Sequence, residues 1–229
     1  MSEALRVALV AEGPTDKVVL QSALTSMLAG RNFILRQLHP EESLPFGPIG
    51  TGWVGVYKWC RSAVARTGGQ LRNDILYHTY DILVLQLDAD VAEKTYASGN
   101  IQESAQDLPC SKPCPPPAAS TNPLRNVLLR WAGETSVPPK TVLCTPSKSM
   151  EAWVVAALFP HDMAAVNDLE CWPHPENRLG QQPASQRIQK RSEDYENHFE
   201  ELKNAWPSLA ANLTEAQRFQ SEFLALAPP

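Results

Sequence analysis

The amino-acid sequence predicts an α/β protein with a mostly parallel sheet that carries helices on both faces. Two almost continuous apolar runs, residues 5–11 and 81–87, are typical of strands that are buried on both faces of a sheet. Segments with helical spacing of apolar residues separate the expected strands, and such alternation of strands and helices indicates a parallel sheet. A chain of 229 residues is long enough for one full domain and a small appendage.

Apolar periodicity and turn residues predict the elements in chain order. Pro14 suits the first turn of a helix, where its missing N–H has no partner to lose. Asn122 followed by Pro123 is a helix-start pattern for the same reason, with Asn122 as the N-cap. Proline and glycine residues make 45–52 a loop. The strands are expected at 5–11, 33–38, 81–87 and 140–145, and the helices at 14–29, 53–66, 122–131 and 149–158.

Two stretches interrupt this alternation. Residues 91–121 have little periodicity and many prolines, so we expect a long insert there, of the kind that is functional or mobile. From residue 161 the sequence becomes polar. It predicts a charged helix over 184–205 and a last helix opened by the capping-box pattern of Thr214 and Gln217. The chain therefore divides into a core domain at 1–160 and a helical appendage at 161–229.

Composition and charge narrow the classes of function. The chain has 20 Lys and Arg residues against 25 Asp and Glu residues, a formal net charge of −5, which argues against binding nucleic acid through a basic coat. It has no run of about 18 apolar residues and no secretory leader pattern, so we expect a cytoplasmic protein without a membrane segment. Five cysteines, an odd number, favour reduced thiols over a disulfide framework.

Carboxylates follow the two most apolar strands. Glu12 comes directly after the first strand, Asp16 lies in the next helical turn, and Asp88 and Asp90 follow the strand at 81–87. Ligands of open α/β sheets bind at the carboxyl ends of parallel strands, and in extended geometry Asp88 and Asp90 leave the same face. If the two strands are neighbours, these acids converge, repel one another and need a cation. All-oxygen ligands favour Mg²⁺, with Mn²⁺ as a substitute.

Each acid also has a simpler explanation. Strands end at the surface, where acids are common, and Asp-x-Asp pairs occur often by chance. Asp16 in the first turn of a helix stabilises the helix dipole whether or not it binds a metal. The joint arrangement is more specific than any of its members, and it is on this arrangement that the metal-site hypothesis depends.

The same residues carry a resemblance to a known family. The segments 10–16 (VAEGPTD) and 85–90 (LQLDAD) resemble the Toprim domain, which is shared by topoisomerases, bacterial primases, RecR-type repair proteins and OLD-family nucleases. The Glu-Gly-x-x-Asp spacing is most similar to the OLD-like nucleases. The segment 146–153 (PSKSMEAW) resembles short bacterial Toprim-like proteins, some linked to phage defence. The resemblance covers residues 5–158, and the long insert and the lack of a fused ATPase domain depart from OLD nucleases.

The resemblance implies a two-metal site and a role for each residue. Glu12 is implied to assist proton transfer as well as to bind metal, and Lys148 to offset charge on the phosphate in the transition state. Lys148 has the alternative of an ordinary solvated lysine, and Glu151 that of an acid stabilising the dipole of its helix. The metal ligands implied are Glu12, Asp88 and Asp90 for a first Mg²⁺, and Asp16 and Glu151 for a second.

Further residues have both a binding and a structural interpretation. A basic cluster is able to contact phosphates, with Trp53, Tyr57 or Trp59 as a stacking face; the alternative is a solvated helix with core aromatics. Cys110 and Cys114 have a spacing found among zinc ligands, and a plain loop is the alternative. The basic cluster comprises Lys58, Arg61, Arg66 and Arg72, and the residues able to complete a zinc site are Cys144, Cys171, His161 and His174.

Two hypotheses of function follow. The first is a Mg²⁺-dependent Toprim-type endonuclease that hydrolyses phosphodiester bonds of DNA or RNA, as an antiphage effector. A separate ATPase is its expected partner, since the chain has no phosphate-binding Gly-x-x-x-x-Gly-Lys loop of its own. The alternative is a catalytically inactive Toprim module that binds nucleic acid or a protein partner. The sequence leaves open whether the chain forms a homo-oligomer.

Overall fold

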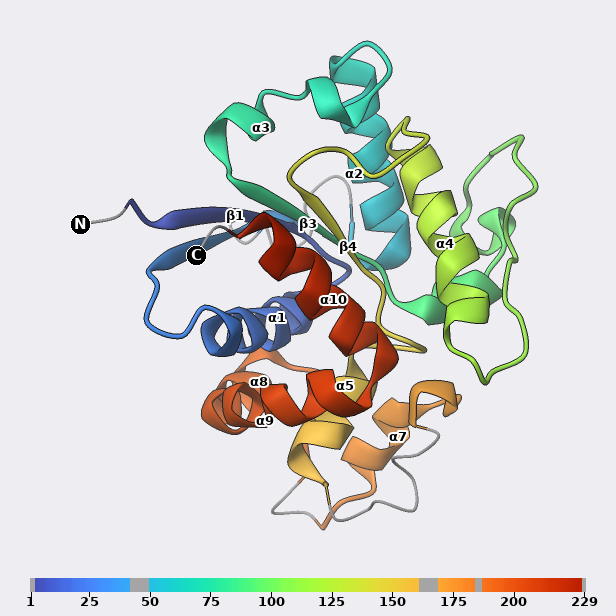
Figure 1. Ribbon diagram of the computed structural model, residues 1–229. Coiled ribbons are helices and arrows are strands. Elements are labelled where there is room, and N and C mark those ends of the chain that lie inside the picture. The colour runs from blue at the N-terminus through green and yellow to red at the C-terminus, as the bar shows by residue number, and fades with distance from the viewer. Residues whose placement is uncertain (1–2, 42–49, 161–168, 184–186, 228–229) are drawn as a thin grey trace.

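One parallel sheet organises the chain. The computed structural model describes residues 3–41, 50–160, 169–183 and 187–227, and in this part of the chain four strands form a sheet in the order β2-β1-β3-β4 (Figure 1). The predicted α/β class is confirmed, as are the four expected strands. The expected loop at 45–52 lies largely outside the described residues. The strands are β1 (Leu5–Val10), β2 (Phe33–His39), β3 (Ile82–Gln86) and β4 (Thr141–Cys144).

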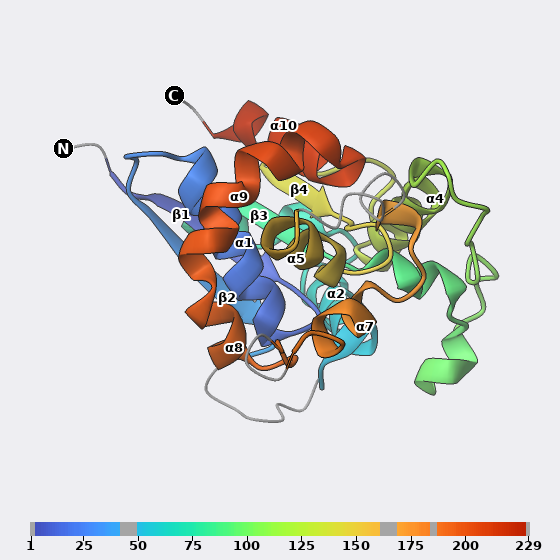
Figure 2. The ribbon, with the colours of Figure 1, turned by 90° about the horizontal axis from the view of Figure 1, so that it is seen from below.

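Helices cover both faces of this sheet (Figures 1 and 2). α1, α5, α9 and α10 pack on one face, and α2 and α4 pack on the other. The helices are α1 (Pro14–Met27), α2 (Gly52–Arg66), α3 (Leu76–Thr79), α4 (Ala118–Trp131), α5 (Glu151–Leu158), α7 (Pro175–Gly180), α8 (Ser192–Asn197), α9 (Phe199–Asn212) and α10 (Thr214–Leu226).

The central strands β1 and β3 are largely apolar because both of their faces are covered. Val7 and Leu9 of β1 belong to the core under α1, α5, α9 and α10. Ala8 and Val10, which alternate with them, belong to the core under α2 and α4. A strand that is buried on both faces has no polar face. Its sequence is therefore a continuous apolar run and does not alternate between apolar and polar residues.

The C-terminal helices share a core with the sheet. Trp153 of α5 lies against Trp206 of α9, with ring centroids 5.4 Å apart, and against Phe219 of α10 at 6.1 Å. All three rings belong to one hydrophobic cluster with Leu9 of β1 and Leu24 of α1. The region expected as a helical appendage is therefore helical, and it completes one layer of the domain.

The insert at 91–121 is anchored on α2 and α4 through an aromatic and charged cluster. The hydroxyl of Tyr96 donates to Asp107 at 2.8 Å and accepts from the indole N–H of Trp131 at 2.9 Å. Arg130 of α4 donates to Asp107 at 2.5 Å, and the rings of Tyr57 and Trp131 meet edge to face at 5.3 Å. These contacts fasten the insert to the face of the sheet opposite α1.

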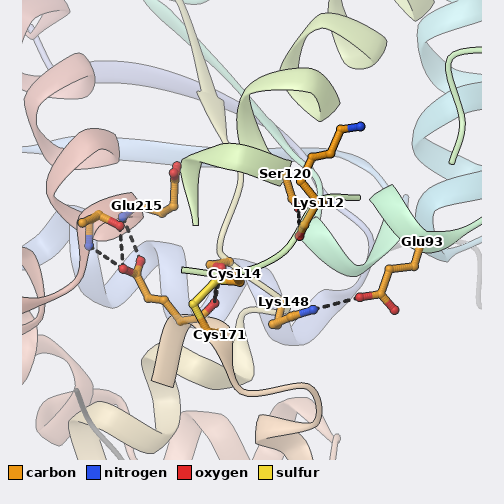
Figure 3. Close-up of a disulfide and its surroundings, with 10 residues drawn as sticks. Glu93, Lys112, Cys114, Ser120, Lys148, Cys171 and Glu215 are labelled. Atoms are coloured by element: carbon orange, nitrogen blue, oxygen red, sulfur yellow. Dashed lines mark hydrogen bonds and ion pairs between the residues drawn. A yellow bond between two sulfur atoms is a disulfide. The ribbon is translucent and has the colours of Figure 1, made fainter. Parts of the chain in front are cut away.

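A disulfide joins Cys114 at the end of the insert to Cys171, 57 residues further on (Figure 3). The expectation of reduced thiols is wrong for this pair, because only the folded topology brings such distant cysteines together. The bond also removes Cys114 from the set of zinc ligands, so the structure contradicts that hypothesis; His161 lies outside the described residues. Cys60, Cys110 and Cys144 are free thiols.

The cellular location expected from the sequence stays a prediction. No helix in the part of the chain that the structure describes is long and apolar enough to cross a bilayer. The Cys114–Cys171 bond is evidence against that location, because disulfides are rare in the reducing cytosol.

One expected helix start and one expected capping box are wrong. α4 begins at Ala118, not at Asn122, because the carbonyls of Pro116 and Pro117 accept hydrogen bonds from the first N–H groups of the helix. Pro123 therefore lies inside α4, in its second turn, and not at its start. α10 does begin at Thr214, but the predicted capping box is replaced by a carboxylate from elsewhere. Glu170 accepts from the N–H of Thr214 at 2.7 Å and from the next N–H at 2.8 Å.

The charged helix expected over 184–205 is only partly present. Residues 187–191 are irregular, and the helical structure begins at Ser192 with α8 and continues in α9. Residues 187–191 therefore have the charge pattern of a solvated helix without being helical. Lys190 of this segment lies at the carboxyl ends of the strands.

We expect Cys114→Ser to lower the free energy of unfolding by about 2–4 kcal/mol, because the lost bond closes a long loop in the unfolded chain. Urea denaturation without reductant measures the change. Cys110→Ser, which removes a free thiol four residues away, is the matched control. It should lower the free energy of unfolding by less than Cys114→Ser does. Equal losses in the two variants, or a wild-type midpoint that does not move on reduction, would contradict this prediction.

Candidate functional site: a carboxylate cluster at the sheet edge

The candidate site lies at the carboxyl ends of β1 and β3, where the strand order reverses. From β1 the chain passes outward to β2 over one face of the sheet and returns to β3 over the other. Open α/β sheets bind ligands at this kind of switch point, because the connections diverge there and leave a crevice. A cavity of about 290 Å³ opens at this point, and Glu12, Asp16 and Lys190 line it.

Glu12 and Asp88 meet at this edge. The backbone N–H of Asp88 donates to the Glu12 carboxylate at 2.8 Å. Gln86, the last residue of β3, connects the same two residues: its side-chain oxygen accepts from the N–H of Glu12 at 3.0 Å, and its amide nitrogen donates to Asp88 at 2.8 Å. The neighbouring strands expected from the sequence are therefore present, and Gln86 is a positioning residue that the sequence patterns did not single out.

Asp16 and Glu151 come to the same place from the first turns of α1 and α5. One oxygen of Asp16 accepts from the N–H of Gly13 at 2.8 Å, and the other is buried without a hydrogen-bond partner among the described residues. The N–H of Met150 donates to Asp88 at 3.1 Å, which fixes the start of α5 against the end of β3. Glu151, the next residue, is only 2% exposed.

Burial and mutual repulsion raise the pKa values of Glu12, Asp16 and Asp88. Burial is the main cause and raises the pKa of Glu12 to about 8 and that of Asp16 to about 7. Neighbouring negative charge adds to both shifts: Asp16 acts on Glu12, and Glu151 acts on Asp16. The pKa of Asp88 is raised well above its ordinary value by burial and then by the charge of Glu12. The cluster therefore favours a compensating cation.

Lys190 supplies positive charge to this cluster from the irregular segment at 187–191. Its ammonium lies 2.9 Å from the carboxylate of Glu151, which also accepts from the hydroxyl of Tyr195 at 3.1 Å. The positive charge of Lys190 opposes the rise in the pKa values of Glu12, Asp16 and Asp88 but does not cancel it. Sequence analysis missed Lys190 because the surrounding mixed charge is typical of a solvated helix; only the tertiary fold identifies it.

Asp90 and Lys148 occupy less central positions than expected. The chain turns into a 3-10 helix at Ala89–Glu93 directly after Asp88, so the extended geometry that would place Asp88 and Asp90 on one face is absent. Asp90 pairs with Lys94 at 3.1 Å, although burial still raises its pKa. Lys148 pairs with Glu93 at 2.8 Å (Figure 3), and its carbonyl accepts from the N–H of Asp90 at 2.8 Å.

The basic cluster predicted to bind nucleic acid divides into two pairs. Arg66 pairs with buried Asp74 at 2.8 Å, and Arg72 pairs with buried Glu134 at 2.6 Å, so both have structural partners. Lys58 and Arg61 are exposed on α2.

The aromatic residues of α2 are core residues and do not form an open stacking face. Trp53 stacks on Trp131 of α4 with ring centroids 6.2 Å apart, and Tyr57 meets the same ring at 5.3 Å. Trp59 is buried, with the guanidinium of Arg66 over its ring at 5.9 Å. These contacts agree with the structural alternative for the aromatics.

The donor chemistry of the cluster fits Mg²⁺ or Mn²⁺, because the side chains that meet at the cavity supply oxygen donors and one oxygen of buried Asp16 has no partner. Among the described residues, however, no three His, Cys, Asp or Glu side chains converge closely enough to hold an ion as they stand. Binding an ion would therefore require the carboxylates to draw together. Glu12, Asp16 and Asp88 are the residues best placed to do so.

No protein-family model, curated protein or solved structure matches this chain. We therefore infer the function from the chemistry and geometry of the carboxylate cluster.

Without divalent metal, we expect stability to fall as the pH rises from about 4 to about 8. Over this window the folded protein retains protons that the unfolded chain has released, because the folded pKa values are about 7 for Asp16 and about 8 for Glu12. Thermal melts in chelator across this range measure the effect. Mg²⁺ should raise the melting temperature more at the upper end of the range than at the lower end.

Glu12→Gln is the control for this experiment, because the variant loses one titrating group and should show a flatter pH profile. A melting temperature that does not respond to Mg²⁺ at either end of the range, in wild type and variant alike, would contradict the prediction.

Proposed function

We propose that this chain is a Mg²⁺-dependent nuclease of the Toprim type, which hydrolyses phosphodiester bonds of DNA or RNA. The observation that carries the proposal is the 2.8 Å hydrogen bond from the Asp88 N–H to the Glu12 carboxylate. It joins, at one sheet edge, the two segments whose sequences resemble the Toprim motifs. Asp16 and Glu151 support the proposal because their charges act on Asp88 at the same place.

Each residue of the site has its own role in the proposed reaction. Glu12, Asp16 and Asp88 would hold the metal, which when bound lowers the pKa of the attacking water and neutralises charge on the phosphate. Glu12 lines the cavity and is placed to accept a proton there. Lys190 lines the same cavity, where its ammonium would stabilise negative charge that develops on the phosphate.

Lys148 has a positioning role in this proposal. Its ion pair with Glu93 and its backbone contact with Asp90 hold the β4–α5 loop against the turn that follows Asp88. The family resemblance implies that Lys148 offsets charge on the phosphate in the transition state. We assign this role to Lys190 instead, because Lys190 lines the cavity among the carboxylates.

The wider setting of the proposed nuclease follows from the resemblance. The likeness to short Toprim-like proteins linked to phage defence supports an antiphage effector in the cytoplasm. The sequence has no nucleotide-phosphate loop, so a separate ATPase is the partner we propose. A homo-oligomer is compatible with both the antiphage role and the ATPase partner.

A second candidate function is a catalytically inactive Toprim module that binds nucleic acid or a protein partner. Two observations favour it: Lys190 already compensates part of the negative charge, and no three potential ligands in the described residues converge on one centre. Metal-dependent cleavage is the property that separates the two functions.

Glu12→Gln and Asp88→Asn should each lower Mn²⁺- or Mg²⁺-dependent cleavage of plasmid DNA or RNA by at least about 100-fold, because each removes a ligand charge from the site. Both substitutions keep the oxygen that accepts the observed hydrogen bonds, so the fold should persist in circular dichroism. Cleavage assays with purified protein, alone and with the product of a neighbouring ATPase gene, measure the effect.

Asp81→Asn is the matched control, because Asp81 lies just before the other end of β3, where its carboxylate accepts from the N–H of Arg6 at 2.8 Å and lies 3.9 Å from the Arg6 guanidinium. The Asp81→Asn variant should cleave nucleic acid at the wild-type rate. Binding without cleavage under any divalent metal would favour the inactive module.

Replacing both Lys58 and Arg61 with Ala should weaken binding to nucleic acid and reduce the slope of log affinity against log salt by about 1–2, because both residues are exposed and able to contact phosphates. Arg66→Ala or Arg72→Ala should instead lower the melting temperature, because each leaves a buried carboxylate without its partner. Fluorescence anisotropy over a salt series and thermal melts measure the two effects. A double variant with unchanged salt dependence would exclude this surface.

A further inference from the structure

A second and larger cavity, of about 550 Å³, adjoins the carboxylate site. Pro14 lines both cavities, so they meet at the start of α1. The volume lies within the range of pockets that take small organic ligands. α1, β2 and the α8–α9 segment surround this cavity, and they lie together in Figure 2.

Amide, charged and aromatic side chains line the second cavity. Lys17 and Gln21 project from one face of α1, four residues apart. Glu196 of α8 and Phe199 at the start of α9 line it from the other side, and Gln37 of β2 lines it from the sheet. The cavity thus offers hydrogen-bond donors, acceptors and the face of a ring.

Gln37 is the feature that points to a ligand. Its side chain is only 4% exposed, and its amide nitrogen donates to the carbonyl of His39 at 3.3 Å. Its side-chain oxygen is buried and has no hydrogen-bond partner among the described residues. Buried carbonyl oxygens in folded proteins nearly always accept a hydrogen bond, so a donor from a bound molecule would complete this one.

We propose that this cavity binds an unpaired nucleobase of the nucleic-acid strand whose phosphate occupies the carboxylate site. The inference rests on the proposed function, because the shared wall at Pro14 places a base beside the reacting phosphate. Glutamine amides and a glutamate read the donors and acceptors of a base edge, and Phe199 offers a stacking surface.

The inference specifies a substrate class. A base inside a duplex is stacked and paired, so it enters a pocket only from a single strand or after it is flipped out. The chain should therefore act on single-stranded or locally unpaired nucleic acid and show a preference among bases at the nucleotide next to the cut.

The test is equilibrium binding of short labelled DNA strands in chelator, where no cleavage interferes. Homopolymers of each base are compared with an abasic strand of the same length. Wild-type protein should bind at least one homopolymer more tightly than the abasic strand. Phe199→Ala should remove between about fivefold and about 150-fold of that difference, the range of one base stacked on an aromatic ring. Gln37→Leu should change the order of preference among bases.

Gln70→Leu, an exposed glutamine away from the cavity, is the control and should leave both affinity and preference unchanged. Equal binding of abasic and base-containing strands by the wild type would overturn the inference, even if cleavage is observed. Base-dependent binding that depends on Phe199 would uphold the pocket even if no metal supports cleavage, in which case only the nuclease proposal fails. If Phe199→Ala unfolds, the order of preference among bases in Gln37→Leu decides the matter: a changed order upholds the inference and an unchanged order overturns it.

Discussion

The constraint on which the structure depends is the collection of negative charge at the carboxyl ends of β1 and β3. Glu12, Asp16, Asp88 and Glu151 are taken out of bulk water together, and neighbouring carboxylates make ionisation of Glu12, Asp16 and Asp88 more costly. Backbone N–H groups at the starts of α1 and α5 compensate part of that energetic cost, and the ammonium of Lys190 compensates a further part. A protein selected only for stability has little reason to keep such an arrangement, so the cluster indicates function.

The parts of the chain that look peripheral are connected to this edge. The irregular segment that precedes α8 delivers Lys190, and α8 itself delivers Tyr195, so the C-terminal region completes the site as well as the core. On the other side, Glu170 lies next to Cys171 of the disulfide and accepts a hydrogen bond from Ser147 of the β4–α5 loop through its carbonyl. The insert, the loop and the last helix thus form one continuous support for the start of α5.

Sequence reasoning predicts the local parts of this design and misses the distant ones. The strands, most helices, and the carboxylates at strand ends follow from apolar runs and from the position of acids after them. Gln86 was missed because a glutamine at the end of a strand has no distinctive pattern, and Lys190 because its neighbours suggest a solvated helix. The disulfide and the Glu170 cap join residues 57 and 44 positions apart, which spacing in the sequence does not encode.

The most direct measurement of the central claim is an anomalous difference map from a crystal soaked in Mn²⁺. The account predicts a peak at about 2.0–2.2 Å from carboxylate oxygens of both Glu12 and Asp88, with Asp16 turned toward it. A crystal that shows no peak at this edge in saturating Mn²⁺, or a peak ligated by neither residue, would contradict the account. In that case the buried charge would belong to a structural network centred on Lys190.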